Sequence, residues 1–286
     1  MDNGSEQLAH SAGTMSDRAL TKAILMCPPE HFEVVYEINP WMSTEDPVDL
    51  ERATGQWDAL AELYGSLGHE VSLIDPAPGL PDMVFTANGG LVIDGKVALP
   101  RFKHPERREE TRHFDRWFSQ QGFDTLIPEH YFEGEGDALY AAGTIFAGYG
   151  YRSSPRSHAE LRSFFGKPVV SLRLVDPRFY HLDTALCALS DETVAYYPPA
   201  FDEPSRRALR SRFAHVIEAS ERDACAFGLN AVSDGVRVVM SGAASGLIET
   251  LGERGFDPLG VDMGEFRKAG GGVKCCSLEL RWEDGA

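Results

Sequence analysis

A repeated pattern of paired strands constrains the fold of this chain more than any other feature. Four stretches share it: VFTANGGLVIDGKVALP (84–100), DALYAAGTIFAGYG (137–150), HLDTALCALSDETVAYYP (181–198) and LNAVSDGVRVVMSG (229–242). Each has an apolar run, a turn rich in Gly, Asp or Ser, and a second apolar run, which is the pattern of a β-hairpin. The stretches recur roughly every 45 to 53 residues. VKCCSLEL (273–280) continues the spacing as a strand and AILMCPP (23–29) completes its unit, so we predict five units.

Amphipathic helical patterns lie between the strand pairs. We predict helices over 48–67, 105–120, 155–165, 203–213 and 243–252. Each unit is then two strands, a helix and a further strand, which is too small to close a core alone. A doubly wound sheet is the alternative, but it predicts single strands between helices and not recurrent hairpins. The predicted fold is therefore a five-bladed α/β propeller built from pseudo-fivefold repeated ββαβ units.

Composition and charge narrow the class of protein further. Residues 1–21 are polar and lack a signal-peptide pattern, so we predict a flexible tail followed by one catalytic domain over 22–286. No run of about 18 apolar residues is present, which argues against a membrane-spanning helix. The net charge of -17 argues against a nucleic-acid surface. Five cysteines without a CxxC pair indicate reduced thiols and a cytoplasmic location.

Polar residues recur at equivalent positions of the repeated units, and pseudo-symmetry would bring such positions together at the axis. They are Asp82, Asn88, Glu133, Asp137, His181, Asp183, Asn230 and Cys275. Carboxylates, a histidine and a thiol form a set suited to attack on a cationic carbon. Paired carboxylates hold a guanidinium group, a thiolate attacks its carbon, and a histidine moves the protons. This chemistry needs no metal and no cofactor.

Simpler explanations remain open for several of these residues. Cys275 alone is also typical of a small buried hydrophobic residue. Alternation along the predicted strand would point Cys276 to the opposite face, where it would only pack. Arg107 and Arg108 in HPERREETRHFDRWF have the pattern of a solvated helix face. A non-catalytic binding protein on the same scaffold is the alternative from a different functional class.

From ILMCPPEHFEVVYEINPWM to GGGVKCCSLEL the chain resembles the guanidino-group-modifying superfamily of amidinotransferases and arginine deiminase-like proteins. HLDT and GGGVKCC, in this order and spacing, carry the resemblance. Within the superfamily the chain looks most like bacterial dimethylargininases and related arginine dihydrolase-type domains. The resemblance implies the five-bladed propeller known as the pentein fold, with a cysteine nucleophile.

Individual residues match positions of the family's motifs. The resemblance assigns three catalytic roles: Cys275 as the nucleophile, His181 as the general acid/base and Glu133, in preference to Glu135, as the carboxylate that pairs with the histidine and the substrate. It also implies a set of substrate-binding residues. These are Asp82, Asn88, Arg107, Arg152 and Asp183. Which arginine takes the substrate carboxylate stays open.

The chain departs from the family's pattern at one position. Where deiminases and dimethylargininases commonly carry an aspartate, this chain has Asn88 in FTAN. An asparagine keeps the hydrogen-bonding reach but loses the charge. The resemblance therefore implies a hydrolase of arginine or N-methylated arginine that works through a covalent Cys275 adduct. An arginine dihydrolase that forms ornithine, and an amidinotransferase, are the alternatives. The expected partner is a small guanidino compound, and a homodimer is compatible with this interpretation.

Overall fold

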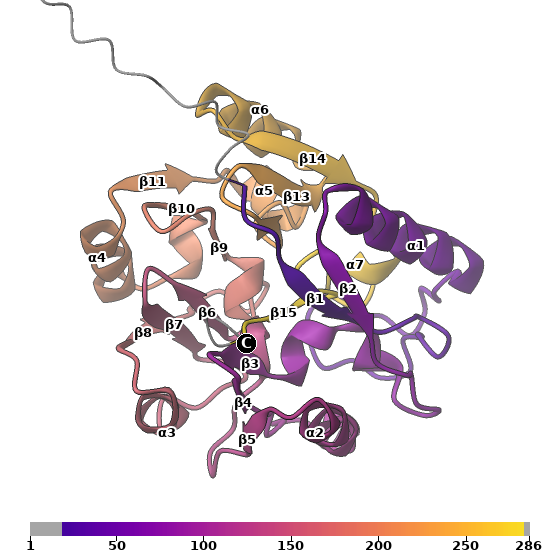
Figure 1. Ribbon diagram of the computed structural model, residues 1–286. Helices are drawn as coiled ribbons and strands as arrows, with labels where there is room; N and C mark the ends of the chain where they lie inside the picture. Colours follow the sequence, from indigo (N-terminus) through magenta and orange to yellow (C-terminus); the bar gives the residue numbers. More distant parts are fainter. Residues whose placement is uncertain (1–18, 283–286) are drawn as a thin grey trace, which may run out of the picture.

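The repeated hairpins form five three-stranded sheets that share one strand pattern in the computed structural model, which describes residues 19–282. In each sheet the middle strand pairs antiparallel with one neighbour and parallel with the other. Figure 1 shows the sheets following one another around the middle of the molecule, with α1, α2, α3, α4 and α6 on the outside. The predicted α/β class and the repeat are confirmed.

Four units follow one another along the chain as strand, strand, helix, strand. They are β3 (Leu91–Ile93), β4 (Lys96–Ala98), α2 (Glu110–Gln120) and β5 (Asp124–Leu126); β6 (Ala138–Ala141), β7 (Thr144–Tyr149), α3 (Ser157–Phe165) and β8 (Val169–Arg173); β9 (Leu186–Ala188), β10 (Thr193–Tyr196), α4 (Glu203–Arg212) and β11 (His215–Glu218); and β12 (Val232–Ser233), β13 (Arg237–Ser241), α6 (Ser245–Glu253) and β14 (Asp257–Val261). The parallel pair in each unit needs the helix as its crossover connection.

The fifth sheet joins segments from opposite ends of the sequence. Strand β15 (Leu278–Leu280) pairs antiparallel with β1 (Ala23–Met26), and β1 pairs parallel with β2 (Glu70–Leu73). Helix α1 (Leu50–Ser66) connects β1 to β2, so this sheet repeats the pattern of the other four. Strand β15 directly follows the turn that carries the two adjacent cysteines, so this sheet fixes the position of that turn.

The helices lie close to their predicted ranges and have recognisable causes. Helix α1 begins after Asp49, whose side chain accepts a hydrogen bond from the Arg52 amide at 3.1 Å. Helix α2 buries Phe114 and Phe118 in a core with Val92 and Leu99, as its amphipathic pattern predicts. Two short helices, α5 (Glu221–Cys225) and α7 (Gly264–Arg267), were not predicted, because one turn carries no readable period.

The strands are shorter than the apolar runs that predicted them, and this corrects one expectation about the cysteines. In VKCCSLEL only Leu278–Leu280 is a strand. Residues 273–277 form a turn in which the Cys276 amide donates to the Gly272 carbonyl at 3.2 Å. Thr86–Gly89, Gly134–Gly136 and Leu182–Thr184 form similar single turns before β3, β6 and β9. The strand-alternation argument for Cys276 is therefore wrong, although its side chain is buried in an apolar cluster.

The two ends of the chain are not part of the described structure. Most of the predicted tail, residues 1–18, lies outside the described residues, as do residues 283–286 of the predicted domain. Within residues 19–282, no helix combines the length and the apolar character that crossing a bilayer requires. All five cysteines lie in the described part and are free thiols.

Candidate active site

The eight predicted site residues, which are those given a catalytic or substrate-binding role by the family resemblance, all lie in turns and loops between the strands and helices. Asp82 and Asn88 lie on consecutive turns before β3, Glu133 precedes β6, and His181 and Asp183 precede β9. The remaining three are Arg107, Arg152 and Cys275. None of the eight side chains is more than 4% exposed. A set of buried charged and polar groups requires compensating contacts, and these contacts define the site.

His181 and Glu133 form the first pair of the site. The imidazole Nε2 of His181 lies 2.7 Å from Oε2 of Glu133. Arg152 donates from Nη1 to the same carboxylate oxygen at 3.0 Å, and the Lys103 amide donates to the other at 3.2 Å. Burial opposes ionisation of Glu133, but Arg152 and His181 outweigh it and hold its pKa well below its usual range. Glu133 is thus a carboxylate that holds the ring of His181.

Cys275 lies in a second group of contacts with Asn230 and Asp183. The Asn230 Nδ2 is 3.1 Å from the Cys275 Sγ, and the Asp183 Oδ2 is 3.3 Å from it. Burial raises the pKa of the Cys275 thiol well above its ordinary value, and the nearby Asp183 raises it further. Burial also raises the pKa of Asp183 to about 7. A thiol next to a carboxylate in a dry site stays protonated until a cation offsets that carboxylate.

Asn88 bridges two of the other predicted residues. Its Oδ1 accepts from the Arg107 Nη1 at 2.8 Å, and its Nδ2 donates to the Glu133 carbonyl at 3.1 Å. The bridge uses one acceptor and one donor on the same side chain, which an asparagine supplies and an ionised aspartate does not. Gly136 leaves room for this amide, because a Cβ there would lie 2.2 Å from the Asn88 Nδ2 and 3.2 Å from the His181 Nδ1.

Arg107 is buried and forms a fork-shaped ion pair. Its Nε and Nη2 each lie 2.8 Å from a carboxylate oxygen of Glu110, one turn further along. The expectation that Arg107 belongs to a solvated helix face is wrong for this residue, whereas Arg108 is exposed. Glu110 was not singled out from the sequence. The spacing of three residues at the start of a helix is the signal that would have found it.

Two carboxylate oxygens in the site lack a partner. Asp82 Oδ1 and Asp183 Oδ1 are buried and have no partner at hydrogen-bonding distance among residues 19–282, although the buried Tyr36 hydroxyl lies close enough to Asp82 to oppose the rise in its pKa. Asp82 Oδ2 lies 3.6 Å from the Arg107 Nε. Burial raises the pKa of Asp82, and Arg107 opposes that rise. Unpaired buried carboxylate oxygens are rare in folded proteins, and they call for a hydrogen-bond donor from a ligand or from water.

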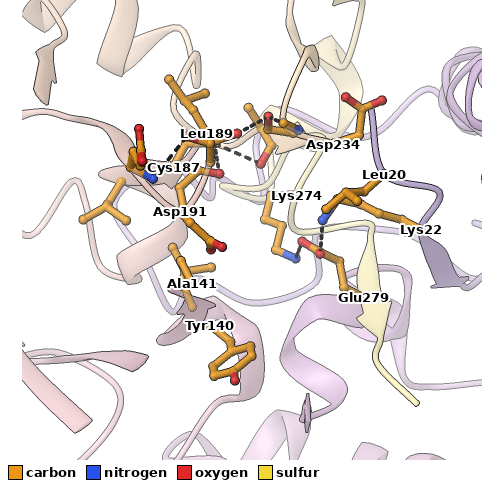
Figure 2. A pocket seen from close by; sticks show the side chains of 18 of the residues that line it. Leu20, Lys22, Tyr140, Ala141, Cys187, Leu189, Asp191, Asp234, Lys274 and Glu279 are labelled. Carbon is orange, nitrogen blue, oxygen red and sulfur yellow. Dashed lines mark hydrogen bonds and ion pairs between the residues drawn. The ribbon is translucent and has the colours of Figure 1, made fainter. Parts of the chain in front are cut away.

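Glu135, the alternative to Glu133, belongs to a different cluster. Its carboxylate pairs with the Lys274 Nζ at 2.6 Å and also contacts Arg281. Lys274 pairs with Glu279 at 3.1 Å as well. In Figure 2 the side chain of Lys274 lies against Glu279, which also binds Lys22, at a cavity of about 570 Å³. None of the eight predicted site residues lines this cavity. The contact with His181 therefore distinguishes Glu133 from Glu135.

The glycine run before Cys275 fits against neighbouring side chains. A Cβ at Gly271 would lie 2.2 Å from the Phe85 ring, and a Cβ at Gly272 would lie 2.9 Å from the Asn230 Oδ1. The loop therefore needs small residues here, because it packs directly against Phe85 and Asn230.

The segment between β1 and α1, residues 27–49, packs over part of the site. The Ile38 carbonyl accepts a hydrogen bond from the Arg152 Nη2 at 2.9 Å. Asn39 donates to the Ala269 carbonyl at 3.0 Å, and the Trp41 indole donates to the Arg178 carbonyl at 2.7 Å. No feature of the sequence predicted this segment as part of the site. Its contacts are to residues more than 100 positions away, so no local pattern encodes them.

Residues 19–282 contain no group of three or more His, Cys, Asp and Glu side chains arranged to hold a metal ion. The side chains that meet in the site are instead a thiol, an imidazole, carboxylates and guanidinium groups. This arrangement can hold a cation between carboxylates, present a nucleophilic sulfur to it and move a proton through His181.

Known proteins of this fold share much of the sequence. The chain is 49% identical over 260 residues to the N(G),N(G)-dimethylarginine dimethylaminohydrolase of Mycobacterium tuberculosis, covering 91% of this chain and 86% of that protein. It is 44% identical over 264 residues to the bifunctional arginine dihydrolase/ornithine cyclodeaminase ArgZ of Synechocystis sp., covering 90% of this chain but 37% of ArgZ. This chain thus spans little more than a third of the bifunctional protein.

A solved structure of one of these relatives has the same fold as this chain. The substrate-bound N-terminal domain of ArgZ, described as an arginine dihydrolase of cyanobacteria, superposes with a TM-score of 0.87 at 43% identity, covering 91% of this chain and 98% of that domain. The model of the family described as "N,N dimethylarginine dimethylhydrolase, eukaryotic" matches residues 37–282. The chain therefore belongs to the dimethylarginine dimethylhydrolase family of guanidino-group-modifying enzymes, as the sequence motifs predicted.

Proposed function

We propose that this protein hydrolyses a guanidinium C–N bond of arginine or N-methylated arginine, with Cys275 as the covalent nucleophile. The observation that carries the proposal is the pair of buried, unpartnered oxygens, Asp82 Oδ1 and Asp183 Oδ1. A guanidinium group supplies the N–H donors that these two oxygens lack, together with a positive charge between the two carboxylates. Family membership gives independent support, because the relatives are named for this chemistry.

The substrate cation would also activate the thiol. Asp183 raises the pKa of Cys275, so a guanidinium that neutralises Asp183 removes part of the cause that keeps the thiol protonated. The free enzyme would then hold an unreactive thiol, and the bound enzyme a thiolate beside the carbon it attacks. Such coupling restricts nucleophile formation to the complex with a cationic ligand.

The steps balance with one nucleophile and one acid/base. The Cys275 thiol gives its proton to His181, and the thiolate adds to the guanidinium carbon. The C–N bond to the departing nitrogen breaks as His181 delivers that proton to the amine. A thiouronium group remains on Cys275. His181 then takes a proton from water, the hydroxide adds to the same carbon, and the C–S bond breaks to release citrulline. Glu133 holds the ring of His181 through both steps by the 2.7 Å contact.

Arg152 is our candidate for the substrate carboxylate. Each guanidinium nitrogen of Arg107 already donates to Glu110, Asn88 or the Asp82 carbonyl. Arg152 instead contacts the loop carbonyl of Ile38 and keeps its Nε without a protein partner among residues 19–282. A loop contact can be exchanged for a ligand more readily than a buried fork-shaped ion pair.

Asn88 favours a second candidate, an arginine dihydrolase. In that reaction a second water attacks citrulline at the same site, so arginine and two waters give ornithine, two ammonia and carbon dioxide. Asn88 stands where an aspartate is common in single-step relatives, and the ArgZ domain described as a dihydrolase shares 43% identity with this chain. The asparagine bridge between Arg107 and Glu133 lacks a negative charge, which favours retention of the neutral citrulline.

The wider organisation is proposed on the same basis. The five sheets of one pattern support a five-bladed propeller, with residues 22–286 as one catalytic domain. The free thiols fit a reducing, cytoplasmic setting.

Product analysis tests the reaction and separates the candidates. Purified protein is incubated with arginine, asymmetric dimethylarginine and agmatine, and citrulline, ornithine and released amines are quantified. Citrulline with dimethylamine supports the dimethylargininase form, and ornithine with ammonia from arginine supports the dihydrolase form. Agmatine lacks the carboxylate and should react poorly. If none of the three is consumed while all bind, the proposed hydrolysis is wrong.

A further inference from the structure

We propose that Asn230 is a further catalytic residue, which stabilises the thiolate of Cys275 by donating a side-chain N–H to its sulfur. The inference rests on the proposed function, because it takes Cys275 as the nucleophile. Asn230 touches the reacting atom, with its Nδ2 at 3.1 Å from Sγ. The residue comes from the turn before β12, in the one unit that contributes none of the eight predicted site residues.

The side-chain amide of Asn230 makes two hydrogen bonds with Cys275, one to its backbone and one to its sulfur. Its Oδ1 accepts the Cys275 backbone N–H at 3.1 Å while its Nδ2 donates to the sulfur. The second N–H of Nδ2 donates to the Asp183 carbonyl at 3.2 Å. Rotating the amide by half a turn would place Oδ1 against the sulfur and a carbonyl oxygen, and Nδ2 against an N–H. The contacts therefore fix which atom of the amide faces the sulfur.

The surroundings hold Asn230 in this orientation. Its side chain is fully buried, and its backbone carbonyl accepts from the Lys274 amide at 3.3 Å. Gly272 gives the amide room, because a Cβ there would lie 2.9 Å from the Asn230 Oδ1. A donor fixed before the reaction costs no reorganisation when negative charge develops on the sulfur. Asn230 is thus a preorganised donor and not a side chain that adapts to the ligand.

The charge balance at the sulfur explains why such a donor matters. The titratable groups that act on Cys275 or respond to it are Asp183, Cys276 and Tyr180. Burial, Asp183 and Cys276 all favour the neutral thiol, and a backbone contact with Gly272 opposes them. Hydrogen bonds to a charged group are stronger than those to a neutral one, so the N–H of Asn230 favours the thiolate over the thiol. Asn230 therefore opposes the effects that keep the thiol protonated.

A purely structural role for Asn230 predicts the opposite change when the amide is lost. If Asn230 only held the turn at residues 273–277, its removal would loosen the turn and admit water, and hydration would lower the pKa of a buried thiol. Loss of the N–H donor to the sulfur would instead raise that pKa. The sign of the change therefore separates the two roles, whatever the change in stability.

The experiment measures the rate of Cys275 alkylation by iodoacetamide as a function of pH, in the absence of substrate, with Cys275→Ser as the blank for the other thiols. Asn230→Leu keeps a similar volume without the donor. We expect the pKa of Cys275 to rise by about one to two. We also expect kcat for arginine to fall roughly 10- to 100-fold with little change in KM.

Ser277→Ala is the matched control in the same turn. Ser277 donates to the Val273 carbonyl at 2.7 Å and contacts the Tyr64 hydroxyl at 2.9 Å, but not the sulfur. This variant should lose thermal stability and keep the alkylation profile. If Asn230→Leu does not fold, Asn230→Met, which also fills the space without a donor, carries the same prediction. An unchanged or lowered pKa in the folded variant overturns the inference. The alkylation profile needs no turnover, so failure of the proposed hydrolysis would be visible separately in the wild-type product assay.

Discussion

The imidazole Nε2 of His181 and the carboxylate Oε2 of Glu133 lie 2.7 Å apart, in a place where neither side chain is more than 1% exposed. Arg152 binds the same oxygen at 3.0 Å. Glu133 and Arg152, 19 positions apart, belong to one unit, and His181, 48 positions from Glu133, comes from the next. A carboxylate in this position orients the ring of His181 for proton transfer.

The first prediction concerns Glu133. Glu133→Gln keeps the shape of the side chain but removes the charge that holds His181 and Arg152. We expect kcat to fall roughly 10²- to 10⁴-fold, the range typical of general acid–base catalysis. Thermal unfolding should also occur at a lower temperature, because Arg152 keeps its charge without a partner. Steady-state kinetics and calorimetry check both outcomes.

Glu135→Gln is the control for that experiment, since it makes the same change two residues away. Glu135 pairs with Lys274 and Arg281, outside the His181 contacts. Its replacement should lower stability but reduce kcat by less than about 10-fold, the effect of a small displacement. Equal losses of kcat in the two variants would remove Glu133 from the mechanism.

The second prediction concerns the reactivity of the thiol. Asp183 raises the pKa of Cys275 and lies 3.3 Å from its sulfur. Asp183→Asn should therefore lower the pKa of Cys275 and speed its alkylation at neutral pH. The same variant should bind arginine more weakly, with KM raised at least about 10-fold, because one anionic contact to the guanidinium is lost. We therefore expect Asp183→Asn to show faster alkylation of Cys275 together with a higher KM for arginine. Slower alkylation would contradict the account.

The third prediction is the pH dependence of stability. Burial raises the pKa of Asp183 from 3.8 to about 7. A carboxylate with a raised folded-state pKa contributes stability below its unfolded value near 4, and this contribution is lost as the pH rises through about 7. Asp183→Asn cannot ionise, so it does not lose this folding stability as the pH rises. Relative to wild type, the variant should gain up to about 4 kcal/mol between pH 4 and pH 8. Urea unfolding at the two pH values measures the difference, and a constant difference would refute it.

The fourth prediction concerns access to the site. All eight predicted site residues are at most 4% exposed, so arginine has to enter by displacing residues that cover them. The contacts of Ile38, Asn39 and Trp41 make residues 27–49 the candidate cover. Amide hydrogen exchange of residues 36–42 should be faster in the free enzyme than with a bound arginine analogue. Equal exchange in both states would place the entrance elsewhere.

The sequence predicted the repeated unit because hairpins and amphipathic helices are written in local patterns. The turn at Asp94 and Gly95 is an example, since both residues have positive φ, 50° and 72°, as a tight hairpin turn requires. The turn at residues 273–277 was predicted as strand, because its apolar character comes from burial and not from strand pairing. A single turn of this kind is too short to show a helical or strand-like repeat of apolar residues in the sequence.

The site was predictable to the extent that motifs fix residue types. Glu133 and Glu135 lie in the same turn, and only their distant partners separate them: His181 for one, Lys274 and Arg281 for the other. The two hydrogen bonds by which Asn88 bridges Arg107 and Glu133 were not predictable either. Both depend on contacts between units, which no local pattern records.

The covalent role of Cys275 is the central claim, and mass spectrometry of the quenched reaction tests it most directly. Wild-type protein is mixed with arginine, quenched in acid within the first turnover and digested. We predict a thiouronium group on Cys275, none on the adjacent Cys276, and neither adduct nor turnover in Cys275→Ser. Normal turnover by Cys275→Ser, or an adduct on a different residue, would contradict the account.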